Sequence, residues 1–409
     1  MVKTIIKKAV ATDEVFGKKY EGTWFEGNGM EIIKEDADLY GVEADGTKHL
    51  LAKFRKGAID KNLVQAGWDA FRNAANPSRN RGAAAGPIDV KGKYWGRRKP
   101  VEIEKWSTRY LQNGSPSKMR VNNNVASGVV GFYEKTPFLK LPCRMTAYAR
   151  GNLKNFVHGM PFIERIDELF AKLAPEAHAK QLAAIRKQKL YQIEKTAFST
   201  VTVNNNFRTA LHKDAGDFRE GFGNLSVIEW GKYHGGYTLM PRFKIGFDVR
   251  TGDFLAMNVH EWHTNSPIVE TAADKAYNKT LPDLRTRDPE VGVAGSDALY
   301  QRLTFVCYFR EKLSECEEGK TFEYYRKEDF DLKTALVEAK KAAVVTLPLP
   351  GITGTVEEAR KAYDTTSAGA AARMLQTRKT KGTAGSPTKA RGTRKTKGAK
   401  RSAVEEEDL

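Results

Sequence analysis

Alternating apolar and polar residues predict three strands in the middle of the chain. They cover residues 200–203, 253–260 and 300–310. Side chains two residues apart share one face of an extended strand. The last strand therefore gathers five residues on one face: Arg302, Thr304, Val306, Tyr308 and Arg310. Two arginines on such a face are costly to bury without a ligand.

Apolar residues at helical spacing predict a helix at residues 161–173 that covers the sheet. Three further helices are expected, at residues 60–75, 175–189 and 334–345. An Asp45-Gly46 pair between two apolar runs predicts a β-hairpin within the first 57 residues. Strands and helices together predict an α+β fold.

The most informative motif is His212-Lys213-Asp214, followed downstream by His263. In extended backbone His212 and Asp214 face the same side, so both can approach one ion. Two histidines and one carboxylate are the ligand set of a non-heme Fe(II) oxygenase, which leaves the opposite coordination positions open. His260 lies three residues before His263 and is an alternative third ligand.

The segment from Phe198 to Arg310 resembles the oxygenase domain of the TET/JBP family, Fe(II)- and 2-oxoglutarate-dependent dioxygenases that hydroxylate the methyl group of 5-methylpyrimidines in DNA. The motifs that carry the resemblance are His212-Lys213-Asp214, His263 within His-Thr-Asn-Ser-Pro-Ile, and the strand that begins Arg302-Leu303-Thr304. Segments 127–132 and 143–147 also look like the lead-in to the family's core. The resemblance covers roughly residues 120 to 315 and is closer to the JBP branch, through residues 206–212 and 216–218.

This resemblance implies a double-stranded β-helix (jelly-roll) core flanked by helices. It implies Fe(II) bound by His212, Asp214 and His263, with O₂ as oxidant. It also implies 2-oxoglutarate held by the planar guanidinium of Arg302, with Thr304 as a further donor. Arg208 and Asn206 could reach this co-substrate as well, although turn chemistry explains them equally well.

Three residues bear on which base is oxidised. Tyr308 could stack on an extruded base, which carries no sequence information. Arg310 only donates hydrogen bonds, so it suits the carbonyl groups of thymine. Asp217, as a carboxylate, favours the amino group of cytosine. The similarity to the JBP branch favours thymine and its product 5-hydroxymethyluracil, with oxidation of 5-methylcytosine to 5-hydroxymethylcytosine as the alternative.

The charge balance fits a DNA-directed enzyme. The chain has 68 Lys and Arg against 50 Asp and Glu, a net charge of +18, as expected for binding the phosphates of double-stranded DNA. Residues 373–401 contain eleven basic and no acidic residues, and 76–86 is a further basic loop. With almost no apolar residues, the tail is expected to be disordered. It serves as a non-specific DNA tether or as a solubilising or targeting tail.

Four regions are expected: an N-terminal α+β region (1–119), the oxygenase core (120–335), a helix with linker (336–366) and the disordered basic tail (367–409). The three cysteines are too few and unpaired for a disulfide framework, which suits a reducing compartment. No apolar run is long enough to span a membrane. We expect a soluble, intracellular monomer, located in the nucleus of a eukaryote or in the cytoplasm of a bacterial or phage-infected host.

Two other functions are compatible with the sequence. One is an oxygenase of the same fold that acts on protein side chains or free nucleotides, against which the basic segments argue. The other is a DNA-binding protein with a vestigial iron site. The complete set of four residues, His212, Asp214, His263 and Arg302, argues against that second alternative.

Overall fold

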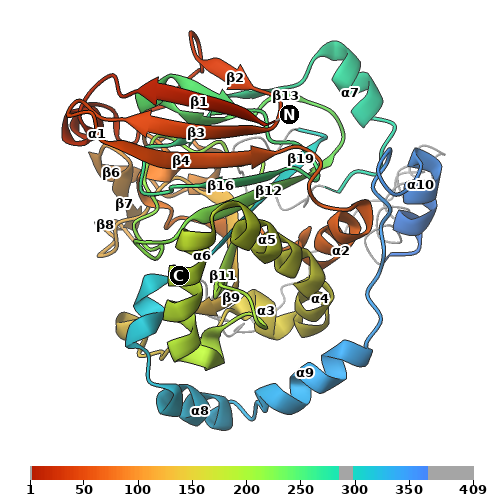
Figure 1. Ribbon diagram of the computed structural model, residues 1–409. Helices are drawn as coiled ribbons and strands as arrows, with labels where there is room; N and C mark the ends of the chain where they lie inside the picture. Colours follow the sequence, from red (N-terminus) through yellow and green to blue (C-terminus); the bar gives the residue numbers. More distant parts are fainter. Residues whose placement is uncertain (1, 285–297, 367–409) are drawn as a thin grey trace, which may run out of the picture.

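The fold is α+β, as the sequence predicts (Figure 1). The computed structural model describes residues 2–284 and 298–366 of the chain. The predicted tail at 367–409 lies outside these residues. Among the helices in the described ranges, none has the length and apolar character needed to cross a membrane.

The largest sheet has ten strands and runs through the middle of the molecule (Figure 1). Its strands, in spatial order, are β1 (Lys3–Lys8), β3 (Ala37–Val42), β4 (Lys48–Arg55), β16 (Phe254–Met257), β12 (Gly223–Trp230), β19 (Gln301–Tyr308), β11 (Thr200–Asn205), β9 (Val125–Tyr133) and β10 (Arg144–Met145), with β5 (Pro77–Ser78) paired to β9. Strands from both sides of residue 119 thus share one sheet. The division of the chain at that residue stays a prediction.

A smaller four-stranded sheet packs against part of the large one. It contains β17 (Thr264–Asn265), β14 (Thr238–Met240), β15 (Ile245–Phe247) and β2 (Glu31–Ile33), in that order. Apolar residues of both sheets form one buried cluster, among them Leu39, Leu255, Ile245 and Phe247. Two short sheets complete the strands: β13 (His234–Gly235) with β18 (Ile268–Val269), and β6 (Pro100–Glu104) with β7 (Ser107–Gln112) and β8 (Ser115–Pro116).

Helices cover the other face of the large sheet. Four of them gather on one side of it in Figure 1: α2 (Lys61–Phe71), α4 (Leu153–His158), α5 (Met160–Leu173) and α6 (Pro175–Ile185). The remaining helices are α1 (Asp13–Tyr20), α3 (Ala147–Gly151), α7 (Ala272–Asn278), α8 (Glu318–Lys327), α9 (Leu332–Lys341) and α10 (Val356–Asp364). The predicted helices and the hairpin around Asp45-Gly46 are confirmed, with α6 ending earlier than expected and continuing as a 3₁₀-helix, η4 (Arg186–Tyr191).

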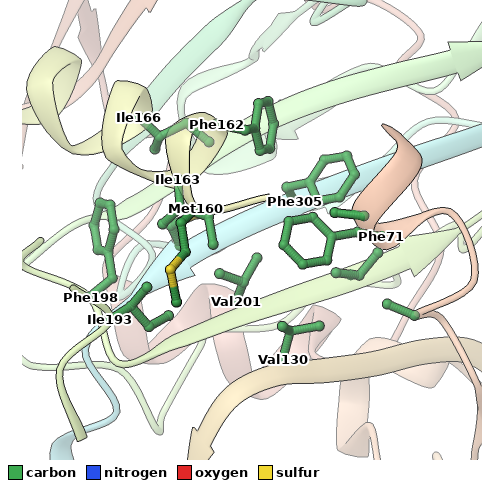
Figure 2. Packing of buried hydrophobic residues seen from close by; sticks show 14 of the residues in the cluster. Phe71, Val130, Met160, Phe162, Ile163, Ile166, Ile193, Phe198, Val201 and Phe305 are labelled. Carbon is green, nitrogen blue, oxygen red and sulfur yellow. The ribbon is translucent and has the colours of Figure 1, made fainter. Parts of the chain in front are cut away.

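Strand β19 separates two environments. Leu303, Phe305 and Cys307 point toward the helices and are fully buried in the larger apolar cluster. Phe305 packs against Phe71 and Phe162, with ring centroids 6.1 and 5.2 Å away, as Figure 2 shows. The alternate residues of β19 point to the opposite side, between the two sheets. The polar face that the sequence alternation predicts for β19 therefore lies in the interior of the molecule.

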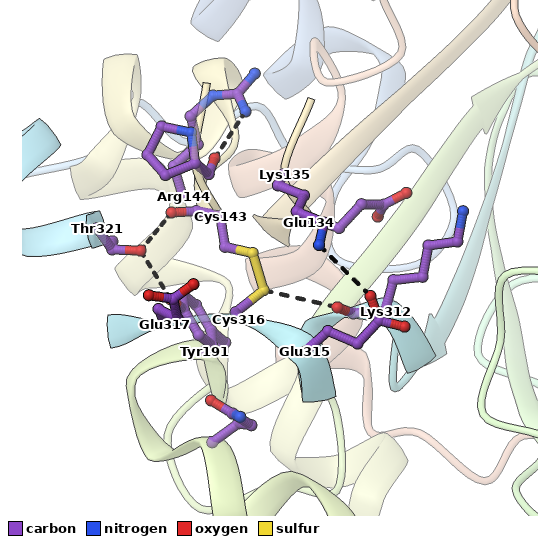
Figure 3. The surroundings of a disulfide bond; sticks show 12 residues. Glu134, Lys135, Cys143, Arg144, Tyr191, Lys312, Glu315, Cys316, Glu317 and Thr321 are labelled. Carbon is purple, nitrogen blue, oxygen red and sulfur yellow. Dashed lines mark hydrogen bonds and ion pairs between the residues drawn. A yellow bond between two sulfur atoms is a disulfide. The ribbon is translucent and has the colours of Figure 1, made fainter. Parts of the chain in front are cut away.

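The expectation that the cysteines are unpaired is wrong for two of them. Cys143 and Cys316 form a disulfide, while Cys307 is free and buried. The disulfide joins the segment beside β10 to the chain after η6 (Glu311–Glu315), and the Thr321 hydroxyl donates a hydrogen bond to the Cys143 carbonyl beside it (Figure 3). The two cysteines are 173 residues apart, and only the tertiary fold brings them together. The inference of a reducing compartment loses the support that unpaired cysteines gave it.

The packing between sheet and helices yields a stability prediction. Phe305→Ala should lower the free energy of unfolding by about 3–5 kcal/mol, because it empties a site enclosed on every side. The matched control is Phe322→Ala, since the Phe322 side chain is 48% exposed and its loss should change stability by no more than about 0.5 kcal/mol. Denaturant unfolding followed by circular dichroism measures both. Equal losses of stability in the two variants would show that the packing of the helices on the sheet does not depend on Phe305.

Candidate metal centre

Backbone pairing holds the three predicted metal ligands together. His212 and His263 form an isolated antiparallel bridge, in which each N–H donates to the other residue's carbonyl at 3.0 and 3.1 Å. The Asp214 N–H donates to the carbonyl of Val259 at 3.0 Å. The loop after β11 is therefore fixed against the segment before β17. Neither motif can shift along the other without breaking these bonds.

The side chains of this group converge on one point. Asp214 Oδ1 lies 3.5 Å from His212 Nε2, and Asp214 Oδ2 lies 3.6 Å from His263 Nε2. One nitrogen or oxygen from each residue lies within 4.8 Å of the others. Two neutral nitrogens and one carboxylate on one side of an ion are the donor set of the facial triad. His260 lies outside this group, and its Nε2 lies 3.3 Å from the carbonyl of Phe218.

Second hydrogen bonds orient both histidine rings. His212 Nδ1 lies 2.8 Å from the Ala210 carbonyl, and His263 Nδ1 lies 2.9 Å from the Glu261 carbonyl. Because a carbonyl only accepts, each Nδ1 carries the proton and donates it. Each Nε2 then faces Asp214 and, once it gives up any proton that it shares with this carboxylate, offers the lone pair that a metal requires.

The charge of the group suits a cation. Burial raises the pKa of Asp214, but hydrogen bonds and charge from His212 and His263 outweigh it, and the pKa is lowered overall. Asp214 is therefore ionised. Burial lowers the pKa of His263, and its contact with Asp214 more than reverses this effect. The Asp214 carboxylate thus attracts positive charge at the point where a metal ion would lie.

Arg302 is buried, and the described residues do not pair its whole guanidinium. It is 2% exposed, and its Nε and Nη2 have no hydrogen-bond partner among the described residues. It lies on β19 two residues before Thr304; Thr304 lines the cavity beside the metal ligands, whereas Arg302 is not one of the lining residues. Gly236 makes room for it, since a Cβ there would lie 3.0 Å from the Arg302 Nε. A desolvated guanidinium with free donors is a binding group for a carboxylate.

Of the four predicted co-substrate residues, Thr304 lines the cavity, whereas Arg302, Asn206 and Arg208 do not. Asn206 accepts a hydrogen bond from the Arg302 N–H and donates one to the Tyr300 carbonyl. Arg208 is paired with Glu26 at 2.8 Å. The residues beside them, Phe207 and Thr209, line the cavity instead. Arg208 lies between these two residues and faces the opposite side, while Asn206 turns the chain at the end of β11 with a φ of 50°.

Thr238 is a polar residue of the site that sequence reasoning missed. It lies on β14 in the smaller sheet, is 2% exposed and lines the cavity. Its hydroxyl has no hydrogen-bond partner among the residues described. No sequence motif marks this threonine. The smaller sheet packs opposite β19, and only this packing brings Thr238 to the cavity that Thr304 also lines.

The cavity has a volume of about 550 Å³ and opens beside the metal ligands. Asp217, Tyr308 and Arg310 all line it, as predicted. The Arg310 guanidinium donates to Glu134 and to the Tyr308 hydroxyl, both at 2.8 Å, and its Nε has no partner among the described side chains. Glu134 is thus a second residue that the sequence did not reveal.

Asp217 is a buried acid at the wall of this cavity. It is 6% exposed, and one of its carboxyl oxygens has no hydrogen-bond partner in the part of the chain that is described. Burial, and then the charge of Asp214, raise its pKa well above the usual range, against the opposing charge of Arg310. In its neutral form a carboxyl group both donates and accepts. Asp217 therefore does not argue for an amino-bearing base alone.

Comparison with known families agrees with this geometry. Residues 128–311 match a family model described as the oxygenase domain of the 2OGFeDO superfamily, named for Tet and JBP. This segment contains most of β9, all strands from β10 to β19 and all three candidate ligands. The TET/JBP oxygenase domain is thus the family that residues 128–311 match. The superfamily in general uses Fe(II), 2-oxoglutarate and O₂, and the arrangement of His212, Asp214 and His263 fits such a metal.

Curated relatives of the TET/JBP domain include proteins of Leishmania and Trypanosoma species. The chain is 36% identical over 197 residues to the bifunctional helicase and thymine dioxygenase JBP2 of Leishmania infantum, covering 47% of this chain and 15% of the relative. It is 35% identical over 293 residues to the protein of that name from Leishmania tarentolae, covering 71% and 21%. It is 33% identical over 191 residues to thymine dioxygenase JBP1-A of Trypanosoma cruzi strain CL Brener, covering 46% and 20%.

These matches confirm the resemblance to the JBP branch, although the chain spans only about a fifth or less of the length of these relatives. A solved structure titled NgTET1 in complex with 5mC DNA aligns with a TM-score of 0.40 and 10% identity, covering 79% of this chain and 90% of the other.

The ligand geometry of the TET/JBP domain predicts which substitutions remove metal binding. Mn(II) at a hundred times its dissociation constant should raise the unfolding free energy of the wild-type protein by about 2.7 kcal/mol. Asp214→Ala and His263→Ala should lose this gain, because each removes one of three ligands. The control His260→Ala should keep it. Denaturant unfolding with and without Mn(II) measures the difference, and loss of the gain in His260→Ala but not in His263→Ala would contradict the assignment.

Proposed function

We propose that this protein is an Fe(II)- and 2-oxoglutarate-dependent dioxygenase that hydroxylates the 5-methyl group of thymine in DNA and forms 5-hydroxymethyluracil. The convergence of His212, Asp214 and His263 carries the proposal, together with the buried Arg302, whose Nε and Nη2 have no partner among the described residues. The oxygenase family of residues 128–311 supports it. The choice of thymine is supported by the names of the relatives, which are thymine dioxygenases.

The fold that we assign to this activity is a double-stranded β-helix. Two facing sheets with one apolar cluster and one cavity between them support this assignment. Such a core offers side chains from both sheets to one interior space. The metal ligands lie in loops next to β11 and β17, while Arg302 and Thr304 come from β19. Iron and co-substrate would thus be held by different elements of one rigid frame.

In this proposal His212, Asp214 and His263 hold the iron, and Arg302 holds the distal carboxylate of 2-oxoglutarate. When bound, the iron, the co-substrate and O₂ supply the oxidation of the methyl group. Thr304 and Thr238 flank the same space with hydroxyl groups, and we assign them to orienting the co-substrate. His263 is only 8% exposed, whereas the Asp214 side chain is 32% exposed, so the site is accessible from one side and the bound substrate has to exclude water from the reacting atoms.

The substrate base has to leave the DNA stack, because a methyl group in a duplex cannot reach a buried metal. We assign Tyr308 to stacking against the base and Arg310 and Asp217 to its polar edge. Arg310 keeps an unpartnered Nε even after its bonds to Glu134 and Tyr308. Donors at this wall suit the carbonyl groups of thymine.

Analysis of DNA tests the function directly. DNA incubated with the protein, Fe(II), 2-oxoglutarate and O₂ should contain 5-hydroxymethyluracil when its nucleosides are measured by mass spectrometry. Asp214→Ala should give none, whereas His260→Ala should still give product. If 5-hydroxymethylcytosine appears on methylated DNA and no oxidised thymine is found, the substrate is 5-methylcytosine. Oxidation of free thymidine or of a peptide with no oxidation of DNA would contradict the assignment to DNA.

The assignment of Arg302 has its own test. Arg302→Lys keeps the charge but loses the two parallel donors that fit a carboxylate. The 2-oxoglutarate concentration for half-maximal rate should rise by roughly tenfold or more, as expected for the loss of at least about 1.4 kcal/mol of binding. Affinity for Mn(II) should not change, since Arg302 is not a metal ligand. An unchanged 2-oxoglutarate dependence would contradict the assignment.

A further inference from the structure

A second cavity of about 240 Å³ adjoins the one that holds the metal ligands. The two cavities share four lining residues: Asn80, Arg81, Ser127 and Arg310. The remaining walls come from residues 74–78, β9, the segment around β10, helix α3 and Tyr324 of α8. A ligand that occupies one cavity can therefore extend into the other past Arg81.

The lining of this second cavity is cationic. Four arginines contribute to it, Arg81, Arg144, Arg150 and Arg310, and the described lining residues include no aspartate or glutamate. Glu134 pairs with Arg310 at 2.8 Å and Glu328 with Arg150 at 3.6 Å, both from outside the lining. The positive charge of the walls thus exceeds the negative charge beside them. Such a space selects an anion.

Of these four arginines, Arg81 is the one whose guanidinium is not paired by the described residues. Its Nε is buried without a hydrogen-bond partner, and the structure gives its guanidinium no ion pair with any described residue. Arg310 lies close enough to oppose its charge, whereas Tyr308, Tyr133 and Asp214 favour it. A guanidinium stays protonated. Holding two of them together at a buried wall is unfavourable unless an anion lies between them.

Aromatic side chains accompany the positive charge. Tyr133, Tyr148 and Tyr324 line the cavity. Arg310 lies over the Tyr133 ring at 4.3 Å and Arg150 over the Tyr324 ring at 5.8 Å. Arginines with aromatic rings form the usual wall of a groove for a nucleic-acid strand. The volume is below the roughly 300 Å³ of a typical small-molecule site, so it suits a phosphate with its sugar better than a free nucleotide.

We propose that this second cavity binds a phosphodiester group of the substrate strand, next to the nucleotide whose base enters the metal-containing cavity, with Arg81 as its main contact. The proposal rests on the proposed DNA substrate and deepens it. Bidentate contact with a phosphate would satisfy the guanidinium. Arg81 lies outside residues 128–311, the segment matched by the family model. The N-terminal region would thus supply a substrate contact of its own.

The experiment pairs a protein change with a DNA change. Arg81→Gln and Arg81→Lys are compared with the wild type on a short oligonucleotide that contains one thymine, using fluorescence anisotropy at several salt concentrations. Each phosphate that flanks the thymine is replaced in turn by an uncharged methylphosphonate. The matched control is Arg186→Gln, which removes the same charge from an exposed position outside both cavities. Mn(II)-dependent stabilisation checks that every variant keeps its fold and metal site.

Arg81→Gln should weaken binding by roughly tenfold, as expected for a hydrogen-bonded charge contact, and should lower the salt slope by about one. Arg81→Lys should restore the slope but only part of the affinity. One methylphosphonate should weaken wild-type binding by a similar factor and have little further effect in Arg81→Gln. Arg186→Gln should show no such coupling to any single phosphate.

Two outcomes overturn the inference while leaving the proposed function intact. The first is oxidation of the oligonucleotide with equal methylphosphonate effects in the wild type and Arg81→Gln. The second is that inorganic phosphate stabilises the wild type but not Arg81→Gln, while DNA affinity is the same in both; the cavity would then bind a free anion. If wild-type protein that binds Mn(II) neither binds nor oxidises the oligonucleotide, the proposed function fails and this inference fails with it.

Discussion

The burial of strand β19 on both faces is the constraint on which the rest of the structure depends. The strand is hydrogen-bonded to β11 on one edge and β12 on the other. Its odd-numbered residues fill an apolar core under the helices, and its even-numbered residues face the space between the sheets. A shift of one residue in register would exchange these two sets. The apolar core thereby fixes where Arg302 and Thr304 lie.

The free energy for holding such polar groups inside has to come from elsewhere in the fold. A buried guanidinium without partners costs on the order of several kcal/mol, and Arg302, Arg310 and Arg81 all keep buried nitrogens without partners among the described residues. The aromatic contacts of Phe305 and the apolar cluster between the sheets offset this cost. Polar groups that are left unsatisfied in a well-packed interior are typical of binding sites.

The N-terminal segments belong to the same architecture as the oxygenase domain. Strands β1, β3 and β4 extend the large sheet beyond β16, and β2 joins the smaller sheet beside β15. The loop that carries Arg81 then lines both cavities. On the opposite edge, the disulfide between Cys143 and Cys316 ties β10 to the chain that leaves β19. Segments from outside the central strands thus extend the sheet at both of its edges.

The sequence by itself determined the local parts of this protein. Period-two alternation located β11, β16 and β19, helical spacing located α2, α5, α6 and α9, and the His-x-Asp motif placed His212 and Asp214 on one side of an extended segment. These properties depend on residues close together in the chain. The family resemblance added His263 and Arg302, which no local pattern connects.

Only the tertiary structure decided which distant residues share a cavity. Thr238, Glu134 and Arg81 come from segments without a motif, and Cys143 and Cys316 are separated by 173 residues. Asn206 and Arg208 looked suited to the co-substrate but do not line the cavity, where their chain neighbours lie instead. Strand pairing, sheet packing and burial set these relations. They are properties of the whole fold, to which each residue contributes only through neighbours that are remote in sequence.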